Sequence, residues 1–142
     1  MRAAWMRVLS LSPWSELEPR AREFISVPHE VLRPPEAGLV MLRGRMGATG
    51  EAFNFGEATV TRCAVRLESG QEGHAYVMGR DAAHARLAAV CDALLQTPEH
   101  RESVCERVIA PLEAGLQREH IEAARKAAAT KVDFFTMVRG DD

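Results

Sequence analysis

Apolar residues in the first 25 positions recur with the period of an amphipathic helix. The pattern predicts two short helices, residues 2–11 and 13–24, with Ser12 as the cap of the second helix and Pro13 at its first helical position. Their apolar faces consist of Trp5, Val8, Leu9, Trp14, Leu17 and Phe24. The helical period then stops near residue 27.

The next section changes to extended structure. Residues 27–45 contain Pro28, Pro34 and Pro35 among β-branched and long apolar side chains, which favours extended segments at 30–33 and 38–45. Together with the strands that follow, this section predicts the start of a small sheet.

A period of two begins at Thr59 and is typical of a strand with unequal faces. Residues 59–68 alternate so that Arg62 and Arg66 share one face. The stretch "ESGQEG" (68–73) has the composition of a turn, and residues 74–78 supply a return strand. The sequence therefore predicts an antiparallel hairpin.

Helical periodicity returns at Asp81, a natural N-cap. Its helix is predicted to bury one side and to end at Thr97-Pro98. That side consists of Ala83, Leu87, Val90, Cys91, Leu94 and Leu95. A shorter helix, residues 98–109, is predicted to stop before Pro111, and a long helix follows at 113–139. Its inner stripe is Ile121, Ala124, Ala128, Val132, Phe135 and Val138.

These elements predict an α+β fold: a small antiparallel sheet of about three or four strands packed with helices, plus a long C-terminal helix. The length of 142 residues suits one domain. We expect a single domain over 1–142, with N-terminal helices in residues 1–25 and a final helix, 113–139, that packs on the domain or leaves it for a partner.

Composition narrows the function classes. The net charge of −2 gives no bulk attraction to nucleic acid, and no apolar run is long enough for a membrane span. Arg7 interrupts the apolar N-terminal stretch, so we expect no secretory leader and a cytoplasmic protein. The cysteines Cys63, Cys91 and Cys105 and the five histidines lack metal-ligand spacing, so no metal is expected.

The basic residues are unusual, since sixteen are arginine and two are lysine. The planar guanidinium suits phosphate or carboxylate, including across protein interfaces. A coding bias, which the abundant alanine supports, explains the same excess.

The glycine-rich stretch around Gly47 raises the question of a phosphate site. It lacks the lysine of a phosphate loop, and "EAFNFGE" (51–57) does not open a helix. Taken alone, the stretch therefore favours a turn between strands over an anion-binding backbone nest. Arg45 before the loop and Arg62 and Arg66 after it favour an anion site; pairing with Glu51, Glu57, Glu68 or another chain's acids is the alternative. The phosphate-contact candidates are Arg45, Gly47, Thr49, Gly50, Arg62, Arg66 and His84.

No catalytic residue is identified from the sequence. His84 follows "GRD" and is expected either to face a site near Arg80 and Asp81 or to be an ordinary histidine at the surface or packed against the helix cap. Cys63 lies on the apolar face of its strand, where a thiol stays protonated. No pair of carboxylates stands out as general acid and base.

The C-terminal segment "KVDFFTMVRGDD" is apolar on nearly every side of its predicted helix. A helix of this kind must be buried all round, either in the core or against a partner. The candidate partner interface consists of Phe134, Phe135, Met137, Val138 and Arg139.

Long motifs resemble the PhnG family of the bacterial carbon–phosphorus lyase system. They are "GLVMLRGRMGATGEAFNFGEATVTRCAVRL" (38–67), "GRDAAHARLAAVCDALL" (79–95), "IAPLEA" (109–114) and "KVDFFTMVRGDD" (131–142). The resemblance covers the chain from about residue 36 and is far more specific than any short motif.

The resemblance implies a subunit of phosphonate catabolism. Proteins of this family work with PhnH, PhnI and PhnL to displace adenine from ATP with methylphosphonate, giving α-D-ribose 1-methylphosphonate 5-triphosphate. They also form a core assembly with PhnH, PhnI and PhnJ, in which PhnI is regarded as the principal catalytic subunit and PhnJ carries the iron–sulfur chemistry. No cofactor is expected in this chain; ATP and phosphonate are substrates of the assembly.

Two hypotheses remain open at this level. The chain either scaffolds PhnI through its C-terminal helix without touching substrate, or it adds phosphate-binding residues to a shared site. It is not expected to be active alone, because arginines and backbone donors position a triphosphate but do not activate a leaving base.

Overall fold

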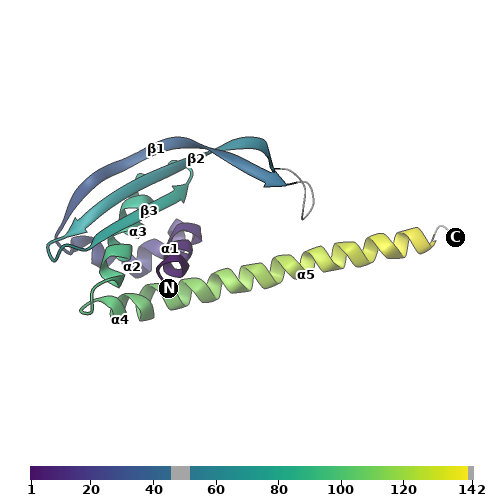
Figure 1. Ribbon diagram of the computed structural model, residues 1–142. Helices are drawn as coiled ribbons and strands as arrows, with labels where there is room; N and C mark the ends of the chain where they lie inside the picture. Colours follow the sequence, from purple (N-terminus) through teal and green to yellow (C-terminus); the bar gives the residue numbers. More distant parts are fainter. Residues whose placement is uncertain (46–51, 141–142) are drawn as a thin grey trace.

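The computed structural model describes the backbone of residues 1–45 and 52–140 and the side chains of residues 1–41 and 56–130. One sheet lies over a layer of helices, which confirms the predicted α+β class (Figure 1). The elements in chain order are α1 (Arg2–Leu11), α2 (Trp14–Ala21), η1 (Arg22–Ser26), β1 (His29–Arg45), β2 (Ala52–Leu67), β3 (Glu72–Met78), α3 (Ala82–Leu95), α4 (Arg101–Val104), η2 (Cys105–Ile109) and α5 (Ala110–Gly140).

The sheet is antiparallel with the order β1-β2-β3. Strand β3 pairs with β2 only from Val60 to Arg66, whereas β1 and β2 continue pairing as far as Arg45 and Ala52. Residues 39–45 and 52–59 therefore form a two-stranded extension, here called the β-arm, that leaves the body (Figure 1). The two extended segments predicted at 30–33 and 38–45 are one irregular strand, with register shifts around the prolines.

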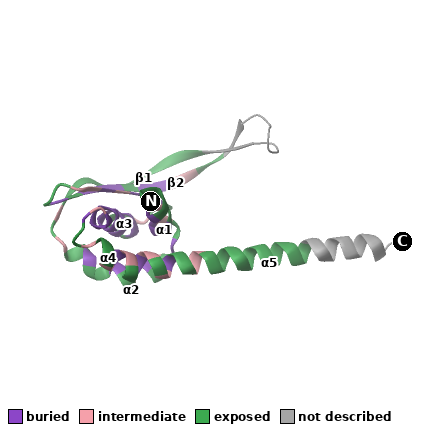
Figure 2. Cartoon of the chain, turned by 60° about the horizontal axis from the view of Figure 1, so that its bottom comes forward, coloured by how far each residue is buried: buried purple, intermediate pink, exposed green. Residues whose placement is uncertain are grey.

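Helix α3 fills the centre of the molecule between the sheet and the other helices (Figure 2). It is buried on almost every side, not only on the one predicted. The prediction was also wrong for Ala83, which was assigned to the buried side but is exposed. Strand residues Cys63, Val65 and Val77 face it from the sheet. The core is therefore one cluster around α3.

A buried carboxylate joins three elements of this core. Asp92 of α3 is fully buried and accepts from Arg2 Nη2 at 2.8 Å, Trp5 Nε1 at 2.7 Å and His74 N at 2.9 Å. The hydrogen bond that Arg2 donates to Asp92 raises the pKa of Arg2. The side chain thus fastens α1 and the start of β3 to α3.

Two predictions about helix ends were wrong. Helix α2 begins at Trp14 with Pro13 as its N-cap. Ser12 is instead the C-cap of α1, where its hydroxyl donates to Val8 O at 2.6 Å. Pro111 does not end a helix, because the π-helical turn η2 precedes it and Ala110 N bonds Cys105 O five residues back. A wider turn relieves the contact between a proline ring and the carbonyl four residues earlier.

Helix α5 outgrows the body. Its 31 residues span about 46 Å at 1.5 Å per residue. Residues 117–130 are all exposed, including the stripe residues Ile121, Ala124 and Ala128, so the helix leaves the core after Leu116 (Figure 2). The β-arm and α5 extend from the body toward the same side (Figure 1). None of the described helices combines the length and apolar character needed to cross a membrane.

Candidate functional site

The glycine stretch follows the end of the β-arm. Gly47, Thr49 and Gly50 lie outside the described residues. Arg45 is the last residue of β1 and pairs through its backbone with Ala52; its side chain is likewise outside the description. The absence of a helix after the loop is confirmed, since residues 52–57 belong to β2.

The strand register separates Arg45 from the other two candidate arginines, Arg62 and Arg66. Arg62 pairs with Glu36 of β1, nine residues before Arg45, which corresponds to about 30 Å of strand. Arg45 therefore lies far from Arg62 and Arg66 along the sheet, so the register does not bring the three arginines together at one anion site. The prediction that Arg62 and Arg66 share a face is confirmed, because both are exposed on the side of the sheet opposite α3.

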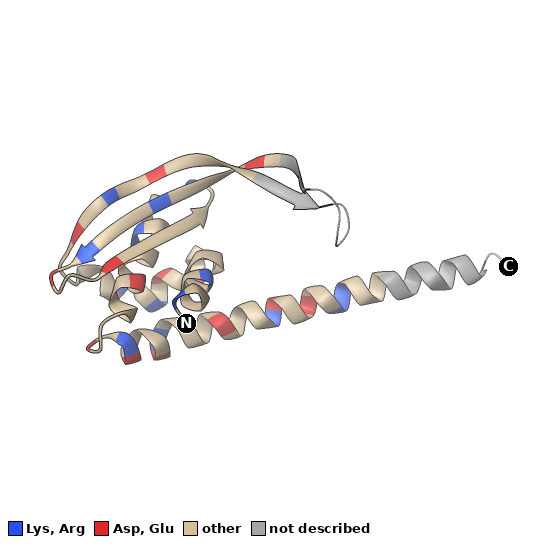
Figure 3. Cartoon of the chain, in the orientation of Figure 1, with Lys and Arg blue, Asp and Glu red and all other residues tan. Residues whose placement is uncertain are grey.

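Arg66 is engaged by acids at the end of the sheet near the β2–β3 turn, where basic and acidic segments of neighbouring strands lie side by side (Figure 3). Its Nη2 donates to Glu72 Oε1 at 2.9 Å, and Glu30 Oε2 lies 4.0 Å from its Nη1. The hydrogen bond from Arg66 lowers the pKa of Glu72 and raises the pKa of Arg66 itself. These partners are not the glutamates expected from the sequence, because Glu72 and Glu30 stand opposite Arg66 on the two neighbouring strands.

His84 lies inside the fold and away from the sheet's outer face. Only 5% of it is exposed, and its Nε2 is 2.8 Å from Leu9 O. Its ring centroid lies 6.0 Å from that of Trp14, and its backbone N–H donates to the Asp81 cap at 3.0 Å. The histidine therefore connects α1 and α2 to α3, and these contacts give it a structural role.

Arg62 borders a hollow of about 320 Å³ on the outer face of the sheet. The walls come from all three strands, with Ala64 at the floor between Arg33 of β1 and His74 of β3. Its lining residues are Leu32, Arg33, Arg62, Cys63, Ala64, His74 and Tyr76. Sequence reasoning missed Arg33, because nothing in the local pattern shows which β1 residue lies beside Arg62.

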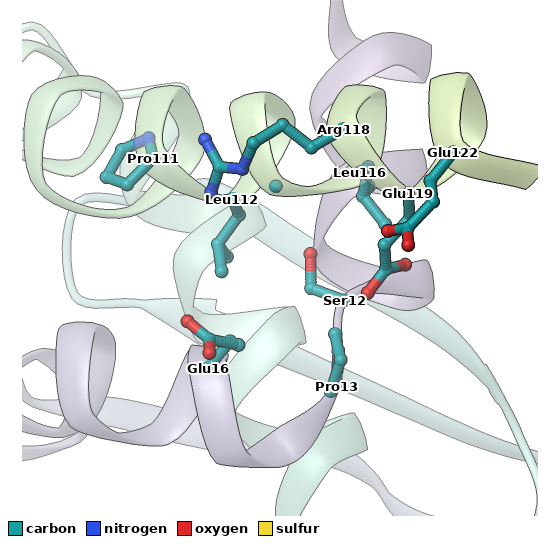
Figure 4. A pocket seen from close by; sticks show the side chains of 10 residues that line it. Ser12, Pro13, Glu16, Pro111, Leu112, Leu116, Arg118, Glu119 and Glu122 are labelled. Carbon is teal, nitrogen blue, oxygen red and sulfur yellow. The ribbon is translucent and has the colours of Figure 1, made fainter. Parts of the chain in front are cut away.

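A second hollow, of about 300 Å³, lies where α5 passes the start of α2 (Figure 4). Three carboxylates line it, those of Glu16, Glu119 and Glu122, with the single cation Arg118. The acids disfavour a phosphate group here. Of these two hollows, the one on the sheet has two arginines and no carboxylate in its lining, whereas acids outnumber the single cation in the other.

The two buried thiols, Cys63 and Cys91, are unsuited to nucleophilic catalysis. Cys63 and Cys91 are buried, and burial raises the pKa of Cys63 and brings the pKa of Cys91 to about 12. Both stay protonated at neutral pH. The described side chains also contain no cluster of three potential metal ligands.

The proposed interface residues Phe134, Phe135, Met137, Val138 and Arg139 belong to the last part of α5, and their side chains lie outside the description. The exposed residues 117–130 carry this segment away from the core. The geometry therefore does not test the predicted interface but places its backbone on the projecting helix.

Together, these features define a small α+β protein whose longest helix and longest strand pair continue past its own core. Comparison with known proteins identifies it more closely: the chain belongs to the phosphonate metabolism protein PhnG family, whose model matches residues 1–140. It is 49% identical over 139 residues to the alpha-D-ribose 1-methylphosphonate 5-triphosphate synthase subunit PhnG of Rhizobium meliloti (strain 1021), covering 96% of this chain and 88% of that relative.

Proposed function

We propose that the chain is a non-autonomous subunit of a ribose 1-methylphosphonate 5-triphosphate synthase. With PhnH, PhnI and PhnL it supports transfer of the ribose triphosphate moiety of ATP to methylphosphonate, with release of adenine. The family membership and the relative's printed name support this assignment. We place the protein in the cytoplasm, in a core assembly that also contains PhnJ.

The observation that carries the proposal is the exposed course of α5. Residues 117–130 are exposed and have little contact with the body. They include the apolar residue Ile121, which is 52% exposed and which a partner would be expected to cover. An isolated helix of this composition is marginal in water, and most helical stability comes from tertiary packing. A second subunit that packs along α5 supplies that stabilisation, and PhnI is the partner we propose.

The chemistry also favours an assisting role. Displacement of adenine at the anomeric carbon needs a positioned triphosphate, stabilisation of an oxocarbenium-like transition state and a proton for the departing base. Among the described side chains, His84 is committed to structural contacts and the buried thiols are protonated. The outer-face arginines suit only the first of these three tasks.

The test is adenine release from ATP and methylphosphonate by purified subunits. We expect none from this chain alone, full activity with PhnH, PhnI and PhnL, and a loss of at least about 10²-fold when this chain is omitted, the scale of a removed preorganised contact or a lost partner. Adenine release by the chain alone, or an unchanged rate without it, contradicts the proposal.

A structural scaffold that stabilises PhnI without touching substrate is the second candidate, favoured by the same exposed helix. It predicts that turnover in the assembled enzyme is insensitive to the arginines on the outer face of the sheet.

A further inference from the structure

We propose that the hollow between Arg33 and Arg62 on the outer face of the sheet binds the polyphosphate chain of a nucleotide. This inference rests on the proposed function, since it assigns a task to this subunit within the synthase. The residues that form the site are Arg33, Arg62, Ala64, His74 and Tyr76.

The strand register brings these residues onto one face. Arg33 of β1, Ala64 of β2 and His74 of β3 form one cross-strand row, and Arg62 and Tyr76 form the next. Residues directly opposite in an antiparallel pair point to the same side, and residues two apart on one strand do so too. The methyl group of Ala64 leaves the space that the longer side chains surround.

Arg66 has acidic partners within the chain, whereas Arg33 and Arg62 have none among the described residues, and this difference favours binding of an anion from outside the chain by Arg33 and Arg62. Arg66 stands four residues from Arg62 on the same strand and face, and it is neutralised by Glu72 and Glu30. No described carboxylate comes within 4.0 Å of the guanidinium of Arg33 or Arg62. Glu36 pairs with Arg62 through the backbone, but its side chain does not line the hollow.

The size of the hollow favours a chain of phosphates over a single tetrahedral anion. Its volume of about 320 Å³ lies at the lower end of the range of about 300–1,000 Å³ that is typical of small-ligand clefts, which is room for more than one phosphate group. The two arginines come from neighbouring strands and are diagonal neighbours, whose Cα atoms lie about 7–8 Å apart, so their forks engage different phosphate groups. The exposed ring of Tyr76 lies at the rim.

The direct test is calorimetric titration of the full chain, and of its assembly with the partner subunits, with inorganic tripolyphosphate. We expect saturable binding that ATP competes for and that methylphosphonate does not. Arg62→Gln and Arg33→Gln should each weaken binding about tenfold or more, the scale of one charge-assisted hydrogen bond. Ala64→Leu should weaken it similarly by filling the hollow without changing charge.

Arg66→Gln is the matched control. It removes the same charge from the same strand, but about 13 Å away along the chain, beyond the Debye length of about 8 Å at physiological salt. We expect less than a twofold change in affinity. An equal loss in Arg62→Gln and Arg66→Gln would mean nonspecific attraction and overturn the proposal, as would the absence of binding to both the chain and its assembly. Thermal melting checks that Ala64→Leu still folds. If Ala64→Leu does not fold, the binding test rests on Arg62→Gln, which changes an exposed side chain and is expected to leave the fold intact.

Measurements on the assembled enzyme show whether Arg62 binds a phosphate of the substrate or a carboxylate of a partner protein. We expect Arg62→Gln to raise the KM for ATP about tenfold while the subunits still co-elute. Loss of co-elution without any effect on tripolyphosphate binding assigns Arg62 to a partner contact and overturns the inference. Failure of the wild-type chain to join the assembly instead contradicts the proposed function, independently of the anion site.

Discussion

Replacing Gly73 with alanine is expected to prevent stable folding. Gly73 lies in β3, opposite Val65, where the backbone of α3 closely approaches the sheet. A Cβ atom at this position would collide with the carbonyl oxygen of Ala89 and stand 2.7 Å from Ala93 N and 2.8 Å from its Cβ. These are mostly backbone atoms of a helix that is itself enclosed, so no flexible side chain can move aside.

The expected effect exceeds the usual penalty of about 1–3 kcal/mol for overpacking, since α3 must separate from the sheet. A loss of about 4 kcal/mol or more removes much of the 5–15 kcal/mol typical of a domain. We expect insoluble protein or a melting temperature lowered by more than about 12 °C. Gly38→Ala is the control, because a Cβ there meets nothing within 4 Å. Equal melting temperatures for the two variants would contradict the packing described here.

Asp92→Ala is expected to destabilise the fold by about 2–5 kcal/mol, because two donors inside the fold each lose an acceptor at a cost of about 1–3 kcal/mol. The substitution leaves the indole N–H of Trp5, the backbone N–H of His74 and the Arg2 guanidinium without their shared acceptor. Asp92 is fully buried, so water does not replace it without opening the core.

Thermal or urea unfolding measures this effect. Asp92→Asn keeps the side-chain shape and one good acceptor, but its amide group points N–H donors at other donors. Its loss of stability should therefore lie between zero and that of Asp92→Ala. Glu99→Ala removes an exposed carboxylate with no hydrogen bond among the described residues, and it should change stability by less than about 0.5 kcal/mol. If Asp92→Ala melts within a few degrees of wild type, the network does not hold α1 in place.

Local chemistry predicted several elements from the sequence. The bounds of α1, the Asp81 cap and the β2–β3 hairpin are all confirmed. Each depends on residues near one another in sequence, where period and cap chemistry act directly.

Other features depend on contacts across the fold. The sequence assigned Gly73 to the turn, but the positive φ of 99° belongs to Gly70, and Gly73 serves close packing against α3. Local composition does not distinguish a glycine needed for backbone conformation from one needed for space. The prediction that a helix stops before Pro111 was wrong for a similar reason, because the compensating π-helical turn has no simple sequence signature.

The candidate site shows the same division. Alternation along β2 correctly placed Arg62 and Arg66 on one face, but the pairing of β1 decides that Arg33 joins Arg62 and that Glu30 approaches Arg66. The register shifts around Pro34 and Pro35 make that pairing unreadable from a count of residues. His84 was a candidate by position in sequence, and only the packing of α1 revealed its internal partner.

The central claim is that another subunit covers the part of α5 that leaves the core. Size-exclusion chromatography of this chain after co-expression with PhnI from the same genome tests it most directly. We expect the two to co-elute, and we expect Ile121→Asp and Phe134→Asp to abolish co-elution while His120→Asp, an exposed neighbour given the same charge, does not. A wild-type chain that elutes as a monomer with no PhnI in its fractions contradicts the account.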